Sequence, residues 1–433
     1  MLISRKLVIR IQQVILDLND DLPLIGTFIL YLWSILHILK LKINKKIQEL
    51  KGRLKITIDQ NKVYWIHPNL IKFIQITNLE KLHNSPKILK GNWDRAKKEF
   101  IKTDLHISLN LRFKSEKPWN ETEYYYNILK EISNGKIRYS CSNKDEWNNY
   151  LSKLDQLYNE LKQKNNFQKE ELLNVNTLLK SKDNLPNFDN IIVNIDRKGK
   201  LLLLKGDHLL SILKTLNLPQ IPIKIRIRHK KWIKFKKELK YFSRRGKLYQ
   251  KLTHPDLQEF PFKHGDIRFN MIKENLSVFK GTLIDIGANL GYFCHKFEDE
   301  GFKCYAVEIN PLYLYFLKKI KQIESRNFEI ISDSIFRYNK KSNLVFDVGL
   351  ALNIFHNLIT RKRTFFKLKK VLNRLEVKEL FFGAHSPIEY KGGRVYKNFT
   401  PKQFTDFIIE NSCLDKVELI GKTPDGRSLF KLT

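Results

Sequence analysis

The sequence predicts an α/β protein: a doubly wound sheet at 263–433, preceded by an α+β domain with a helical insertion at 56–240. Short apolar runs alternate with helical patterns in the C-terminal part, and two further runs around a Gly-containing turn close the chain as a hairpin. A chain of 433 residues is long for one core. We therefore expect two further parts, a hydrophobic and basic helical segment at 1–55 and a basic linker at 241–262.

A strand–turn–helix pattern begins at the apolar run that ends in Asp285. Gly287 and Gly291 follow, and because glycine has no Cβ, the backbone can turn tightly there and approach a ligand. Asn289, between them, is a residue type that tolerates positive φ. Glu308 ends the next apolar run about 20 residues on, where an acid can hold the hydroxyls of a ribose. The pattern predicts a site for a nucleoside-bearing cofactor.

The turn differs from a dinucleotide site, which would require Gly-x-Gly-x-x-Gly around a pyrophosphate. Asn289 replaces one glycine, and the charge of Asp285 would repel a phosphate but suits an ammonium group. The order Asp-x-Gly-x-Asn-x-Gly, with a later acid at a strand end, resembles the class I S-adenosylmethionine-dependent methyltransferases. The segment 328–334, which contains Asp333, and the segment 344–357 resemble the third and fourth strands of that family.

This resemblance implies a seven-stranded sheet, completed by the C-terminal hairpin, and S-adenosylmethionine as the cofactor. It places Asp333 opposite the adenine amino group. The cofactor contacts it implies are Asp285, Gly287, Asn289, Gly291, Glu308 and Asp333. The four cysteines show neither a CxxC pair nor metal-ligand spacing, so we expect no metal site and a reducing, cytoplasmic location.

Two histidines are candidates for a catalytic base. A hydroxyl acceptor must lose a proton during methyl transfer, and His suits that role near neutral pH. His356 lies just beyond the fourth predicted strand, and His385 follows the fifth, so both are expected at the same sheet edge. For each residue the alternative is a structural hydrogen bond to a backbone carbonyl.

The formal net charge is +34, and its densest run is 224–251, where Trp232, Phe235, Tyr241 and Phe242 are interleaved with Lys and Arg. Basic residues with stacking aromatics suit single-stranded nucleic acid, and they also suit an anionic membrane surface. A third interpretation is a Lys-rich, Ile-rich and Asn-rich composition without a dedicated partner. The charge alone does not distinguish these three interpretations, and we rank nucleic acid as the least favoured of them.

The segment 22–39 carries no formal charge and approaches the length that spans a bilayer. Pro23 and Gly26 weaken it, and basic residues flank it on both sides. We expect an interfacial anchor or a pairing helix, hence a peripheral membrane location through residues 1–46.

The region 191–228 reads as a hairpin, a Gly-Asp-His loop, a helix and an alternating strand. This order resembles the ParB/sulfiredoxin-like fold, in which an Arg of the loop grips a phosphate. Leu209 stands where that Arg would be, so we expect a structural or substrate-presenting module with His208 packed at a helix start.

Trp93 and Trp119 lie in segments that resemble proteins found beside glycosyltransferases of surface polysaccharide pathways. Exposed Trp near acids would suit sugar stacking, although a buried anchor is an equal alternative. The sequence thus predicts a methyltransferase that acts on a hydroxyl of a surface glycan or lipid-linked sugar. The alternatives are an RNA methyltransferase that uses 224–251, and a non-catalytic scaffold with a decayed cofactor loop.

Overall fold

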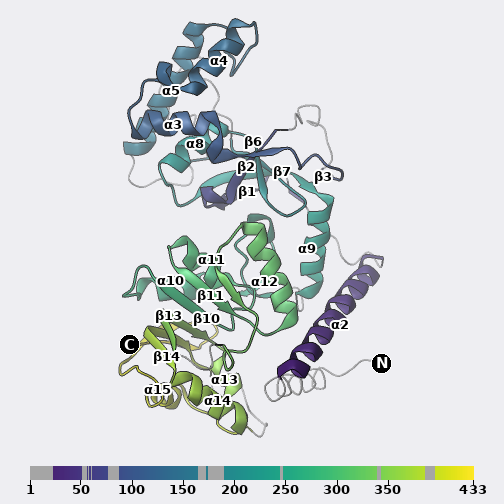
Figure 1. The fold of residues 1–433 in the computed structure, drawn as a ribbon, viewed down its shortest axis with the longest axis vertical. Helices are drawn as coiled ribbons and strands as arrows, with labels where there is room; N and C mark the ends of the chain where they lie inside the picture. Colours follow the sequence, from purple (N-terminus) through teal and green to yellow (C-terminus); the bar gives the residue numbers. More distant parts are fainter. Residues whose placement is uncertain are drawn as a thin grey trace. The chain divides into compact units, whose positions relative to one another are not determined.

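The computed structural model describes residues 23–50, 56, 58–59, 61–76, 87–163, 172–173, 190–243, 247–338, 343–385 and 395–433. The chain divides into two compact units (Figure 1). Unit 1 comprises residues 1–54 and 238–433, and unit 2 comprises residues 55–237. The four-part division expected from the sequence stays a prediction.

Unit 1 contains a seven-stranded sheet. Its strands are β10 (Thr282–Ile286), β11 (Lys303–Val307), β12 (Glu329–Ile331), β13 (Leu344–Leu352), β14 (Leu375–Gly383), β15 (Val417–Lys422) and β16 (Ser428–Leu432). The order is β12-β11-β10-β13-β14-β16-β15, with parallel pairing from β12 to β14 and antiparallel pairing of β16 with both neighbours. The predicted seven strands and their closing hairpin are therefore present.

Helices cover both faces of this sheet (Figure 1). They are α10 (Ile267–Glu274), α11 (Tyr292–Asp299), α12 (Pro311–Glu324), α13 (Phe355–Leu358), α14 (Lys362–Leu372) and α15 (Pro401–Ile409). One apolar cluster joins the sheet to α10 and α11, and a second joins it to α14 and α15. The strand order reverses at β10, and such a reversal opens a crevice at the carboxyl ends of parallel strands.

A short parallel pair also belongs to unit 1, β8 (Leu248–Gln250) with β9 (Phe262–His264). The N-terminal helix α2 (Pro23–Leu50) is assigned to the same unit, where the ammonium of Lys45 lies 3.8 Å from the carboxylate of Glu238. No helix in the described part of the chain is long and apolar enough to cross a membrane. Residues 1–22, part of the proposed anchor, lie outside the described residues.

Unit 2 contains a second sheet, in the order β1-β7-β5-β6-β2-β4, with β3 paired to β7. Its strands are β1 (Val63–Ile66), β2 (Ile71–Gln75), β3 (Ile88–Leu89), β4 (Lys97–Glu99), β5 (Ile192–Ile195), β6 (Leu201–Lys205) and β7 (Ile221–His229). Its helices include α3 (Asp104–Lys114), α4 (Glu123–Ser133), α5 (Lys144–Gln163) and α8 (Asp207–Thr215). The expected hairpin, helix and strand at 191–228 are thus β5, β6, α8 and β7.

The basic run 224–251 is not a uniformly exposed surface. Part of it forms α9 (Lys230–Phe242), an amphipathic helix in which the rings of Trp232 and Phe235 are buried. Lys236 and Arg228 are buried as well. These two aromatic rings are therefore not available to stack on bases. Arg244 and Arg245 lie outside the described residues.

Candidate cofactor site

The turn after β10 has the backbone that its residue types suggest. The φ angles are +86° at Gly287, +54° at Asn289 and +82° at Gly291. A Cβ on Gly291 would lie 2.5 Å from Cδ1 of Leu317, and one on Gly287 would lie 3.1 Å from Cγ1 of Ile354. Both the left-handed backbone and the close packing therefore require glycine at these two positions.

Glu308, at the end of β11, ties this turn to the next loop. Its Oε2 accepts a hydrogen bond from the backbone N–H of Asn289 at 2.9 Å. Its Oε1 accepts from the N–H groups of Ile309 at 2.8 Å and Asn310 at 2.7 Å. Burial raises the pKa of Glu308 to about 7, although the three N–H donors favour the charged form. The carboxylate thus lies buried beside the turn, where the sequence predicts a ribose.

A cavity of about 390 Å³ opens at the carboxyl ends of β10, β11 and β13. That volume is within the range of small-molecule sites. At one end its walls combine apolar side chains, which a flat aromatic base could contact, with the polar groups of Asn289, Glu308 and Ser334. The described lining residues at this end are Gly287, Asn289, Val307, Glu308, Ile309, Tyr313, Ser334, Ile335 and Phe336.

Asp333, which the resemblance places opposite an adenine, pairs with Arg337 in the structure. The Oδ1 of Asp333 accepts a hydrogen bond from Nε of Arg337 at 2.9 Å, and its side chain is 41% exposed. Among the described residues, Ser334, Ile335 and Phe336 line the cavity at this strand end. An adenine contact by Asp333 stays a prediction.

Asp285 lies beneath the turn with a group of buried polar side chains, which we call the polar cluster: Gln250, His264, Arg268 and Asp285. Arg268 is 3% exposed and Asp285 is 2% exposed. Burial raises the pKa of Asp285 to about 7; the charge of Arg268 opposes this shift and that of Glu308 adds to it. The acid and the guanidinium therefore influence each other electrostatically.

Each member of the polar cluster has at least one atom without a hydrogen-bond partner among the described residues. These atoms are Oε1 of Gln250, Nε2 of His264, Nε and Nη1 of Arg268, and Oδ2 of Asp285. Tyr249 joins the cluster to the cavity, because its ring contacts His264 at 4.8 Å between centroids and also lines the cavity. Buried polar atoms without partners are uncommon and cost about 1–3 kcal/mol each, so they indicate a place that a ligand or water completes.

The sequence did not indicate Gln250, His264 or Arg268. Their strands and helix precede the motif, and no local pattern separates them from other polar residues. Burial is the property that distinguishes them, and it depends on the tertiary packing.

The two candidate histidines lie together at the other end of the cavity. The rings of His356 and His385 stack with centroids 5.2 Å apart at 28°. His356 lines the cavity, and burial lowers its pKa to about 3, with the charges of His385 and Arg427 acting in the same direction. His356 is therefore an uncharged imidazole at neutral pH, and Arg427 lines the cavity beside it.

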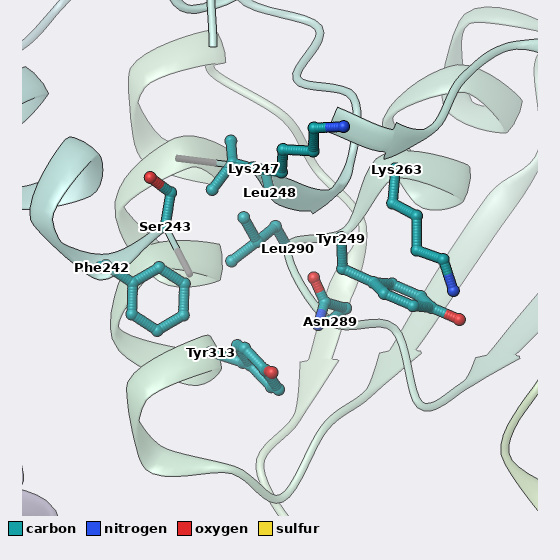
Figure 2. A pocket seen from close by; sticks show the side chains of 9 residues that line it. All are labelled: Phe242, Ser243, Lys247, Leu248, Tyr249, Lys263, Asn289, Leu290 and Tyr313. Atoms are coloured by element: carbon teal, nitrogen blue, oxygen red, sulfur yellow. The ribbon is translucent and has the colours of Figure 1, made fainter. Parts of the chain in front are cut away.

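A second pocket, of about 280 Å³, adjoins the cavity and shares Tyr249, Asn289 and Tyr313 with it. Figure 2 shows Phe242, Leu290 and Tyr313 gathered on one side of this pocket, and Tyr249 and Lys263 on the other. Ser243, Lys247 and Leu248 complete its described lining. Tyr249 thus separates two spaces at the same edge of the sheet.

No protein-family model matches the sequence, and no curated protein matches it. Among solved structures, the chain is similar to the bifunctional kinase-methyltransferase WbdD, with 14% identity, a TM-score of 0.36, and coverage of 43% of this chain and 44% of that one. The chain thus spans less than half of WbdD. The chain is also similar to the methyltransferase domain of bacterial CtHen1, with 15% identity, a TM-score of 0.31, and coverage of 39% of this chain and 98% of that one. A third similar structure is an S-adenosylmethionine-dependent methyltransferase from Clostridium acetobutylicum ATCC 824, with 12% identity, a TM-score of 0.31, and coverage of 39% of this chain and 88% of that one.

At these values the matches support no inference about ligand or activity. The seven strands and the closing hairpin of unit 1 agree with the methyltransferase-like fold that the sequence motifs implied. The ParB/sulfiredoxin-like assignment of 56–240 gains no support from the comparisons and stays a prediction.

Proposed function

We propose that the chain is an S-adenosylmethionine-dependent methyltransferase. The observation that carries this proposal is the cavity at the carboxyl ends of β10, β11 and β13. The left-handed turn of Gly287 and Asn289 lines it, and the buried carboxylate of Glu308 stands at its side. A ribose placed there would offer two hydroxyl donors to Glu308.

The polar cluster supports an adenosyl amino acid in preference to a dinucleotide. The guanidinium of Arg268 has N–H groups to offer an α-carboxylate, and Asp285 has a carboxylate oxygen to offer an α-ammonium. A pyrophosphate in this place would lie against the carboxylate of Asp285, and burying two like charges together is unfavourable. Both ends of the zwitterion thus have a complement within one cluster.

S-adenosylmethionine, when bound, supplies a methyl group on a sulfonium for in-line displacement. This methyl group would pass to the oxygen of an acceptor hydroxyl, and His356, which lines the cavity, would be placed to receive the hydroxyl proton. Burial keeps His356 uncharged, so the imidazole would not repel the sulfonium. His385 is a positioning residue, because it stacks on the ring of His356.

A glycan hydroxyl remains the acceptor that we propose. Support comes from an open pocket in unit 2 whose described lining includes the exposed ring of Tyr126 and the side chains of Asn120, Lys144 and Asn148. A ring with amides and an ammonium around it suits a sugar. Trp119 lines the pocket but is buried, and its Nε1 donates to Asp155 at 3.0 Å, so of the two alternatives it fits the buried anchor.

We also propose peripheral attachment at the cytoplasmic membrane face. It is supported by the exposed apolar side chains of α2, which alternate with exposed lysines. The apolar side chains are Tyr31, Leu32, Leu36, Leu39, Ile43 and Ile47, and the lysines are Lys40, Lys42 and Lys46. Such a helix binds at the interface of an anionic bilayer.

The test of the cofactor is calorimetric titration of the whole chain with S-adenosylhomocysteine, for the wild type, Glu308→Ala and Glu329→Ala. Glu329 is an exposed acid on the adjacent β12 and serves as the matched control. We expect saturable binding in the wild type and in Glu329→Ala, and a loss of about a hundredfold or more in Glu308→Ala, since two charge-assisted hydrogen bonds are lost. Absence of both heat and thermal stabilisation in the wild type would exclude the methyltransferase and leave the non-catalytic scaffold.

A further inference from the structure

The guanidinium of Arg268 lies close to two aromatic rings. Its Cζ is 5.6 Å from the ring centre of Phe293, on α11, and 6.0 Å from that of Tyr249, on β8. Nε and Nη1 of Arg268 have no hydrogen-bond partner among the described residues. A ring face attracts a cation without fixing the direction of its N–H groups. That direction therefore depends on where α10, which carries Arg268, lies relative to α11.

A hydrogen bond joins the starts of these two helices. The hydroxyl of Tyr292 donates to Oδ1 of Asp266 at 2.5 Å, and Tyr292 is buried. Asp266 directly precedes α10 and lies two positions before Arg268, whereas Tyr292 is the first residue of α11 and directly precedes Phe293. Neighbouring residues of α11 thus contact Asp266 and Arg268, and only the contact with Asp266 has the direction of a hydrogen bond.

The carboxylate of Asp266 is also held from β8. Its Oδ2 accepts a hydrogen bond from Nζ of Lys251, which directly follows Gln250 at the end of β8. Burial alone would raise the pKa of Asp266, but the hydrogen bonds from Lys251 and Tyr292 outweigh it and lower the pKa, so the group is charged at neutral pH. One carboxylate therefore ties together β8, α10 and α11.

Each of these three segments bears a part of the proposed cofactor site. Gly291, the last residue of the left-handed turn, directly precedes Tyr292. Gln250 and Arg268 belong to the polar cluster. A movement of Asp266 away from Tyr292 would change the distance between the turn and the guanidinium, and binding groups must be held to within about 0.5 Å to keep their strength.

We infer that Asp266 is a positioning residue, which through Tyr292 holds Arg268 at the distance from the turn that selects an adenosyl ligand with an α-carboxylate. The inference rests on the proposed function and deepens it, because it names the residues that set the specificity for the amino-acid end of the cofactor. Neither Asp266 nor Tyr292 belongs to the described lining of the cavity, so both act through Arg268.

The test is calorimetric titration of the whole chain with S-adenosylhomocysteine and with methylthioadenosine, which lacks the amino-acid end and so does not depend on Arg268. The variants are Tyr292→Phe, Asp266→Leu, Asp266→Asn and the control Tyr315→Phe. Tyr315 is a matched control because its hydroxyl also donates to an acid of unit 1, Oε2 of Glu238, at 3.0 Å. It does not belong to the described lining of either cavity.

Tyr292→Phe and Asp266→Leu should each lower the affinity for S-adenosylhomocysteine by about tenfold and that for methylthioadenosine by less than about twofold, because a hydrogen bond to a charged group is lost and Arg268 shifts. Asp266→Asn should retain most of the affinity, since its amide oxygen still accepts from Tyr292. Tyr315→Phe should bind both ligands as the wild type does.

Two results would overturn the inference: equal losses for the two ligands, which would make Asp266 a support of the whole site, or unchanged affinity of Tyr292→Phe for S-adenosylhomocysteine. Thermal unfolding of each variant separates a loss of binding from a loss of the fold. Failure of the wild type to bind either ligand would remove the proposed function, and this inference with it. Binding by the wild type without a selective loss in the variants would remove the inference alone.

Discussion

The two units each contain a cluster of buried polar side chains, but the clusters differ in how completely they are hydrogen-bonded. In unit 2, Nε2 of His208 lies 2.9 Å from the hydroxyl of Tyr124, and Nδ1 lies 3.1 Å from the hydroxyl of Tyr150. The adjacent Asp207 accepts a hydrogen bond from the hydroxyl of Tyr139 at 3.2 Å. Both ring nitrogens of His208 therefore have partners within the unit.

In unit 1, each member of the polar cluster has an atom without a hydrogen-bond partner among the described residues. Since each such atom costs about 1–3 kcal/mol, the folded unit bears a cost that a ligand or water could offset. We therefore expect a structural role for His208, whose two ring nitrogens both have partners, and a binding role for the polar cluster of unit 1. Arg268 and His208 are both buried, so burial alone does not separate these roles.

The largest expected effect follows from His208→Ala. It removes the partner of two buried tyrosine hydroxyls and leaves a cavity, so unfolding in urea should show a loss of about 3 kcal/mol or more. Affinity for S-adenosylhomocysteine should not change. A variant that kept its stability and lost this affinity would contradict the structural role of His208.

Arg268→Met should give the opposite result. The α-carboxylate loses its partner, so affinity for S-adenosylhomocysteine should fall by about thirtyfold, whereas affinity for methylthioadenosine, which lacks the amino-acid end, should remain. Stability should change by about 1 kcal/mol or less, because the guanidinium atoms without partners are removed with the side chain, and Asp285, whose pKa is already about 7, can take up a proton. Calorimetry with both ligands and urea unfolding measure the two effects.

Arg326→Met is the matched control. Arg326 is also largely buried, but its guanidinium pairs with Asp299 and Glu324. Its removal should destabilise the fold by about 3 kcal/mol and leave both affinities unchanged, because breaking a buried pair leaves an uncompensated charge. If Arg268→Met and Arg326→Met lowered the affinity for S-adenosylhomocysteine equally, the polar cluster would have no special role in binding.

The cofactor turn was predictable from the sequence because its requirements are local. Positive φ selects Gly287, Asn289 and Gly291, and the apolar runs on either side fix the strands that hold them. The meeting of His356 with His385 was also predictable, since the carboxyl ends of neighbouring parallel strands share one edge. Their chemical roles stay predictions.

The polar cluster and Arg427 could not be predicted in this way. They come from β8, β9, α10 and the C-terminal hairpin, and tertiary packing alone brings them together. In a chain with 79 Lys and Arg residues, no local signal separates a buried arginine from an exposed one. The burial of Trp232 and Phe235 was missed for the same reason. Their helical spacing puts them on one face of α9, and tertiary packing buries that face.

The pH dependence of binding sharpens the comparison within unit 1. Burial raises the pKa of both Glu308 and Asp285 to about 7. Below pH 7 both carboxyl groups are protonated in the free protein. Glu308 must lose its proton to accept from the ribose hydroxyls, and Asp285 must lose its proton to bind the α-ammonium. Ligand affinity should therefore rise with pH up to about 7 and then level off. Methylthioadenosine depends on Glu308 alone, so its affinity should change by up to about tenfold per pH unit, and that of S-adenosylhomocysteine by more. Equal slopes for the two ligands would remove Asp285 from the site.

The smallest expected effect distinguishes the strain of the turn from its packing. Gly426 has φ +79° and open space around it, so Gly426→Ala should cost about 1 kcal/mol of backbone strain. Gly291 has φ +82°, but a Cβ there would also meet Leu317, so Gly291→Ala should cost about 1 kcal/mol more. Urea unfolding gives both values.

Gly291→Ala should also lower affinity for S-adenosylhomocysteine, because relief of the clash moves the turn that holds Asn289 against Glu308. If both variants bound this ligand as the wild type does, the turn would be a structural feature, and the polar cluster alone would define the site.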